Sequence, residues 1–143
     1  MITNEKQYMI TKKKLQVLYE EIDRITAGRE ELPAKDQLVL VSMQVSQDQL
    51  EKEILAYDLL KTKSPADLEE RKIDDLPTLL IEYKILSGLT QKGFAQKIGM
   101  KEQQLQRYEA ENFDSISFKN LLKILHAVGL AITVKANIPQ ASL

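Results

Sequence analysis

The sequence predicts a mainly α-helical chain: an N-terminal antiparallel helical hairpin, then a bundle of short helices, then one short β-strand. Apolar residues recur at spacings of three and four along residues 1–62, which is the period of a helix face. Glycines then separate short segments within residues 77–129, which is typical of several short helices. The stretch LAITVKA, residues 130–136, alternates and is β-branched, which predicts a strand.

Composition limits the classes of protein that the chain can belong to. Its 143 residues, 43% of them apolar, are enough for one ordinary domain or two small ones. There is no cysteine and only one histidine, His126, so we expect no metal site, no cofactor and no enzyme activity. No leader sequence and no membrane-spanning run is visible, so we expect a cytoplasmic protein.

Charge differs between the two halves of the chain. Residues 1–76 carry 12 Lys and Arg against 16 Asp and Glu, whereas residues 77–143 carry 8 against 5. The C-terminal half is therefore mildly cationic, which fits an anion-binding module joined to an acidic one.

The first helix of the hairpin is expected to begin at Thr11, a plausible N-cap, and to end near Ala27 before Gly28. Its inner face is marked by apolar residues at helical spacing: Leu15, Leu18, Ile22 and Ile25. These side chains predict one buried face that packs against the next helix.

The second helix is expected to cover residues 34–61, opened by Pro33. One stripe is expected to face the first helix: Val39, Met43, Ser46, Leu50, Ile54 and Tyr57. A second apolar flank lies elsewhere on the same helix: Leu38, Val41, Val45, Leu55 and Leu59. A helix that is apolar on two sides favours two neighbours, so residues 1–62 are interpreted as a dimerisation or partner-binding hairpin. The alternative is a hairpin that packs only within its own domain.

Residues 63–76 are charged and are interpreted as a linker with one short helix at Ser64-Pro65. Residues 130–143 are interpreted as the strand and a tail. Because a single strand is not stable by itself, we expect it to pair with the same strand of a second subunit.

Residues 91–110 have the register of two helices joined by a tight turn. Gly99 can take positive φ at little cost, which lets the chain turn sharply. Five residues are expected to fix the two helices in the core: Phe94, Ala95, Ile98, Leu105 and Tyr108. The opposite face of the second helix is then held outward, which is the geometry of a helix-turn-helix that reads a DNA major groove. The aromatic residues Tyr83 and Phe118 are also expected in the core.

Eight polar or charged residues are expected to contact double-stranded DNA: Gln91, Lys92, Lys101, Glu102, Gln103, Gln106, Arg107 and Lys119. Gln pairs with adenine N6 and N7, Arg with guanine O6 and N7, and Glu accepts from cytosine N4. A glutamine at a helix start can bind phosphate, and lysines add attraction that is independent of base sequence. The alternative is a polar surface with no ligand.

The stretch LTQKGFAQKIGMKEQQLQRYEAENFDSISFKNLLKILHAVGL resembles the Xre/Cro-like helix-turn-helix family of phage and bacterial repressors. The resemblance covers about residues 77–129 and implies a five-helix, lambda-repressor-like domain that binds operator DNA as a homodimer. It places Gln91 at the phosphate-contacting position and Glu102, Gln103 and Arg107 at base-reading positions. Lys101 departs from the family, which often has a Ser or Thr cap there.

The C-terminal strand after Gly-Leu is similar to that of antitoxins of the HipB and HigA kind. Two functions therefore remain open. The first is a sequence-specific transcriptional regulator, a repressor that acts as a dimer on a palindromic operator. The alternative is an antitoxin that neutralises a toxin partner and represses its own operon.

Overall fold

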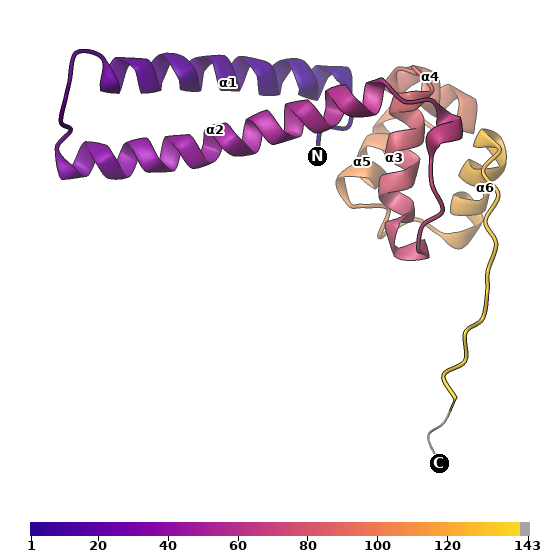
Figure 1. Ribbon diagram of the computed structural model, residues 1–143. Coiled ribbons are helices and arrows are strands. Elements are labelled where there is room, and N and C mark those ends of the chain that lie inside the picture. The colour runs from indigo at the N-terminus through magenta and orange to yellow at the C-terminus, as the bar shows by residue number, and fades with distance from the viewer. Residues whose placement is uncertain (141–143) are drawn as a thin grey trace. The chain divides into compact units, whose positions relative to one another are not determined.

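The structure, a computed structural model, describes residues 1–140 of the chain. Within these residues every regular element is helical and no strand forms, which confirms the mainly α-helical prediction (Figure 1). The chain divides into two compact units, Met1–Thr90 and Gln91–Leu143. The first unit holds helices α1 to α3 and the second holds α4 to α6. The predicted domain limits at residues 62, 76 and 129 stay predictions.

Helix α1 spans Glu5–Thr26 and begins earlier than the sequence predicted. Its N-cap is Asn4, whose side-chain oxygen accepts from the Gln7 backbone N–H at 2.9 Å. Thr11, the predicted cap, lies inside the helix and donates its hydroxyl to the Gln7 carbonyl at 2.8 Å. Asn is at least as good a cap as Thr, and the acidic Glu5 that follows suits the first turn of a helix.

Helix α2 spans Ala34–Lys61, the range that the sequence predicted, and it runs antiparallel to α1 (Figure 1). The inner stripe is shifted at its start: Val39 is 39% exposed, whereas Leu40 is half-buried. Ser46, the polar step of the stripe, is also exposed, and Gln47 is half-buried beside it. The other stripe residues toward the C-terminus are half-buried or buried as predicted, and Tyr57 is the most buried of them. The antiparallel hairpin is therefore confirmed, with corrections to the inner stripe at Val39 and Ser46.

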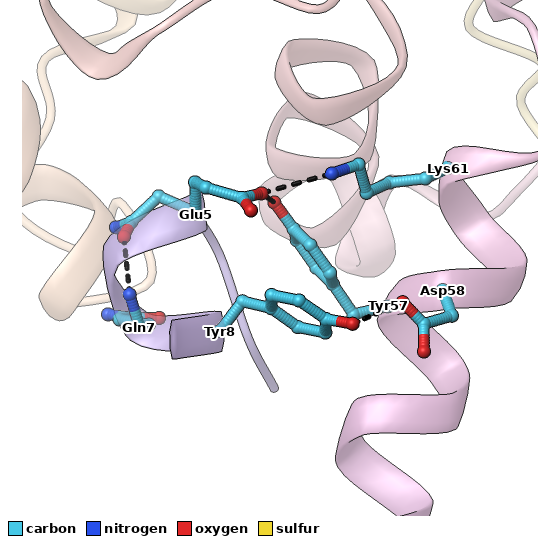
Figure 2. A network of polar contacts seen from close by, with 7 residues as sticks. Glu5, Gln7, Tyr8, Tyr57, Asp58 and Lys61 are labelled. Atoms are coloured by element: carbon cyan, nitrogen blue, oxygen red, sulfur yellow. Dashed lines mark hydrogen bonds and ion pairs between the residues drawn. The ribbon is translucent and has the colours of Figure 1, made fainter. Parts of the chain in front are cut away.

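Five residues join the first turns of α1 to the last turns of α2; we call this group the clasp (Figure 2). The rings of Tyr8 and Tyr57 stack at 4.9 Å between centroids. The Tyr8 hydroxyl donates to Asp58 at 2.7 Å, and the Tyr57 hydroxyl donates to Glu5 at 3.2 Å. Lys61 forms an ion pair with the same Glu5 carboxylate at 3.0 Å. The clasp closes the open end of the hairpin.

The clasp predicts a loss of hairpin stability in alkaline solution. Burial, followed by the Glu5 charge, raises the pKa of Tyr57 to about 12, whereas an unfolded tyrosine titrates near about 10. The folded state thus favours the protonated phenol of Tyr57. The phenol therefore makes its full contribution to the free energy of unfolding below about pH 10, and this contribution is lost as the pH rises to about 12. We expect a loss of about 1–2 kcal/mol in the free energy of unfolding, allowing for solvent screening.

Urea unfolding followed by circular dichroism at neutral and at strongly alkaline pH measures this loss. The matched control is Tyr57→Phe, which keeps the ring but has no phenol to ionise. The alkaline loss should be clearly smaller in the Phe variant, and an equal loss in both chains would contradict the assignment to Tyr57.

The opposite side of α2 carries five exposed apolar residues, which we call the outer stripe. Their exposed fractions lie between 55% and 75%: Leu38, Val41, Val45, Leu55 and Leu59. Helix α1 packs on the other side of α2 and leaves these residues uncovered. The second apolar flank read from the sequence is therefore an exposed surface of the hairpin unit.

A short segment with two 3₁₀ turns, Pro65–Asp67 and Ile73–Asp75, connects α2 to α3. The first turn is held by a capping box in which the Ser64 backbone N–H donates to the Asp67 carboxylate at 2.6 Å. Helix α3 spans Leu76–Leu86, and Gly88 follows it with a φ of +66°. Of the charged residues in α3, Lys84 is buried, which the sequence did not indicate.

The second unit contains α4 (Gln91–Ile98), α5 (Glu102–Ala110) and α6 (Phe118–Val128). Both α5 and α6 pack against α4. Residues 76–129 therefore form four α-helices, not the five that the family resemblance implied. Ser117 caps α6 by accepting from the Asn120 backbone N–H at 3.1 Å.

The predicted strand at residues 130–136 does not form, and residues 130–140 have no helix or strand. Val134 and Ile138 are 89% and 87% exposed. The physical reason is that a strand needs a hydrogen-bonding partner, which the described part of this single chain does not offer. The rest of the predicted tail, residues 141–143, lies outside the described residues.

Candidate nucleic-acid interface

The turn between α4 and α5 has the geometry that the sequence predicted at Gly99. The Gly99 φ is +70°, and the Met100 backbone N–H donates to the Ala95 carbonyl at 2.9 Å. This is the hydrogen bond of a Schellman motif, which ends a helix and reverses the chain direction. A Cβ at Gly99 would lie 3.6 Å from the Lys123 side chain, an ordinary contact. Backbone conformation, not space, therefore favours glycine here.

Buried apolar residues hold α5 in one orientation. All five predicted core positions of α4 and α5 are buried, and Leu105 is 0% exposed. Tyr108 stacks against Phe113 at 6.3 Å between ring centroids. Since Leu105 and Tyr108 lie three apart, they fix the same face of α5 inward, and the other face is held outward.

We call this outward surface the polar face of α5: Glu102, Gln103, Gln106 and Arg107. Gln103, Gln106 and Arg107 are exposed, whereas Glu102 is half-buried. Gln103 and Arg107 lie one helical turn apart, so their side chains project from the same side. The structure thus places four of the predicted contact residues on one exposed helix face. Their contacts with bases stay predictions.

The environment of Arg107 orients its side chain. The guanidinium carbon lies 5.7 Å from the centroid of the Tyr108 ring, which allows a cation–π contact. Gln104 donates to the Tyr108 hydroxyl at 3.2 Å, and this bond, with one from Asn120, lowers the pKa of Tyr108. Gln104 is therefore hydrogen-bonded within the protein and, unlike Gln103 and Gln106, does not belong to the polar face.

The other predicted contact residues lie at helix starts. Gln91, the first residue of α4, is half-buried and donates its amide to the Glu109 carboxylate at 3.0 Å. Lys92 and Lys119 are exposed near the starts of α4 and α6. Lys101 is exposed at the N-cap of α5 and provides no side-chain capping bond, as its departure from the family pattern predicted.

Three features of this unit were not anticipated from the sequence. Phe118 was expected in the core but is 74% exposed at the first position of α6. Phe113 is buried with a φ of +60°, and its N–H donates to the Tyr108 carbonyl at 2.7 Å after the end of α5. Lys123 reaches the Gly99 turn from α6, and no sequence signal separates it from other surface lysines.

The comparisons with known proteins agree with this geometry. A protein-family model described as helix-turn-helix matches residues 80–134. This segment is a helix-turn-helix domain of the Xre/Cro-like family. The match supports DNA binding and transcription regulation as the role of the domain. The searches of curated proteins and of solved structures returned no match.

The helix-turn-helix match begins at residue 80, so it does not cover the hairpin α1–α2. Within residues 1–140 no helix is both long and apolar enough to cross a membrane. The function of the hairpin therefore has to be inferred from the residues on its own surface.

Proposed function

We propose that the chain is a sequence-specific transcriptional repressor that binds a palindromic operator as a homodimer and has no catalytic activity. The observation that carries the proposal is the polar face of α5, whose glutamines and arginine are exposed while Leu105 and Tyr108 are buried. A rigid helix with an exposed amide and guanidinium face matches the donor and acceptor pattern of base edges in the major groove.

Cations beside this helix supply the second part of the proposed interface. Lys92, Lys101 and Lys119 are exposed, and Lys123 lies at the turn that leads into α5. Such residues neutralise phosphates, which sets the position of the protein on the duplex without reading sequence. A two-fold dimer would place two α5 helices in successive major grooves, about 34 Å apart, and this requires a palindromic operator.

A salt titration of binding to DNA from upstream of the gene tests the proposal. Because binding releases counterions from neutralised phosphates, affinity should fall steeply, by at least tenfold between about 50 and 200 mM salt. A random duplex of equal length is the control and should bind more weakly at every salt concentration. An affinity that does not change with salt, or equal binding of both duplexes, would contradict the proposal.

Repression itself needs a cellular measurement. A reporter gene behind the same upstream DNA should be less active when the intact chain is produced, and the reduction should disappear for a chain with Gln103→Ala and Arg107→Ala. Higher reporter activity with the intact chain would indicate an activator.

An antitoxin role is the second candidate, and the outer surface of α1 favours it. Met9, Ile10 and Val17 are exposed by 57%, 46% and 57%, which gives the hairpin an apolar surface for a protein partner. Co-purification with the product of an adjacent reading frame would test this role. Capture should be lost when Ile10 and Val17 are both replaced by Glu, and unchanged capture would remove this surface as the binding site.

A further inference from the structure

The outer stripe of α2 belongs to a longer and more regular pattern. The two exposed residues between Val45 and Leu55 that continue its spacing are Asp48 and Lys52. We call the full set of seven positions the seam: Leu38, Val41, Val45, Asp48, Lys52, Leu55 and Leu59. Successive positions alternate by three and four, which is the heptad spacing of a coiled-coil interface. Because α1 packs on the other side of α2, the seam is free to take a second helix.

The order of residues along the seam is symmetric in a specific way. Val45 and Leu55 lie equally far from the midpoint at Leu50, and so do Asp48 and Lys52. In an antiparallel pair of identical helices centred there, each Asp48 faces Lys52 of the other copy. In a parallel pair, Asp48 would instead face Asp48, and like charges would meet at two levels of the interface.

The two charged residues of the seam have no polar partner in the hairpin. Neither side chain forms a hydrogen bond or an ion pair within residues 1–140. Together with Val45 they line a shallow open groove at the centre of α2. Their charges are therefore available to a partner that places a positive charge opposite Asp48 and a negative charge opposite Lys52. The same helix of a second copy does this when it runs antiparallel.

We propose that α2 pairs antiparallel with α2 of a second copy of this chain, so that Asp48 meets Lys52 and Val45 meets Leu55 across a two-fold axis. Val41 then meets Leu59 at both ends of the interface. The pairing supplies the dimer on which the proposed function rests, but it is a property of the hairpin and does not require DNA.

The area available is sufficient for such a dimer. Each residue of the outer stripe exposes more than half of its surface, so each can bury roughly 60–100 Å² against a partner. Five residues from each copy give roughly 600–1,000 Å². Flanking polar side chains add to this area, which brings the total to the lower limit of about 1,000 Å² for a specific interface.

Site-directed cross-linking tests the register directly, because the natural chain has no cysteine. One chain carries Val45→Cys and a second chain, of different mass, carries Leu55→Cys. A short bifunctional maleimide should join the two chains to each other. It should not join two copies of the Val45→Cys chain, whose thiols would lie about 15 Å apart along the antiparallel pair.

Ser46→Cys is the matched control, because Ser46 is exposed and adjacent in sequence but points about 100° away from the seam. Mixed with the Leu55→Cys chain, it should give no cross-link. Efficient joining of two Val45→Cys chains would overturn the proposal in favour of a parallel pair. A chain that sediments as a monomer and gives no cross-link would overturn it in favour of a different protein on this surface.

Charge exchange provides an independent test. Asp48→Lys and Lys52→Asp should each weaken the dimer about tenfold or more, because each brings like charges together at two contacts, and the double exchange should restore it. The same two residues also lie four apart on one helix. Helix content, measured on the dilute monomer, must therefore be equal in all variants. Failure of the double exchange to restore the dimer would overturn the antiparallel register.

These experiments separate this inference from the proposed function. Cross-linking without salt-dependent DNA binding would support the hairpin dimer and contradict the proposed regulatory function. DNA binding by a chain whose seam does not cross-link would support the regulatory function and would mean that the chain dimerises through a surface other than the seam.

Discussion

Replacing Leu105 with alanine is expected to destabilise the helix-turn-helix unit by about 2–5 kcal/mol. The side chain is 0% exposed and holds the inner face of α5, so its removal leaves a cavity. Small domains are stable by only about 5–15 kcal/mol, so the unfolded fraction should become large near physiological temperature. Urea unfolding followed by circular dichroism measures the change, and DNA affinity should fall with it.

Phe118→Ala is the matched control for that experiment. Phe118 belongs to the same unit and is larger than leucine, but it is 74% exposed. Its removal should change the free energy of unfolding by no more than about 0.5 kcal/mol. Similar losses for both substitutions would mean that Phe118 is buried and that its position at the start of α6 is wrong.

Arg107→Ala is expected to have the largest effect on DNA recognition without unfolding the protein. Under the proposed function it should cost about 1–3 kcal/mol in affinity for the operator and relax the preference at one base pair. The side chain is exposed, so the free energy of unfolding should change little. Binding to a panel of operators, each with one base pair changed, measures both effects.

Two further variants make that result specific. Arg107→Lys retains the charge but loses the planar fork that binds guanine at two points, so it should restore general affinity but not the base preference. Arg24→Ala removes an arginine with a 74% exposed side chain from α1 and should leave binding unchanged. If lysine restored both affinity and preference, Arg107 would be a phosphate contact.

The helix-turn-helix could be predicted from the sequence because its signals are local. Gly99, the small Ala95 and the spacing of Leu105 and Tyr108 each determine one feature of the turn, and all are found as expected. The bounds of α2 were equally well marked by Pro33 and by a continuous apolar pattern. In these segments, neighbouring residues decide the conformation and little depends on the distant chain.

The features that sequence reasoning missed depend on contacts between distant residues. Thr11 and Asn4 can both cap a helix, and the turns between them are held partly by Tyr8 against Tyr57, which no local pattern shows. Phe118 has the composition of a core residue, but its place in the first turn of α6 leaves it exposed. A buried Lys84 is likewise outside what a hydrophobic pattern can indicate.

The strand prediction shows a different limit. Alternation along residues 130–136 describes a segment that is able to pair, but pairing also needs a second strand. The contact residues of the polar face could be predicted only in part. The turn predicts which side chains are exposed, but it does not predict which bases they meet.

The clasp has a consequence for the order in which the hairpin assembles. Glu5 and Lys61 are 56 positions apart, whereas Arg29 and Asp36, which pair near the hairpin loop, are only seven apart. Closing a long loop costs more chain entropy than closing a short one. The contacts between α1 and α2 should therefore form first near the hairpin loop, and those of the clasp should form last. Contacts made after the transition state slow only the reverse reaction, so the clasp sets the lifetime of the folded hairpin and has little influence on how fast it forms.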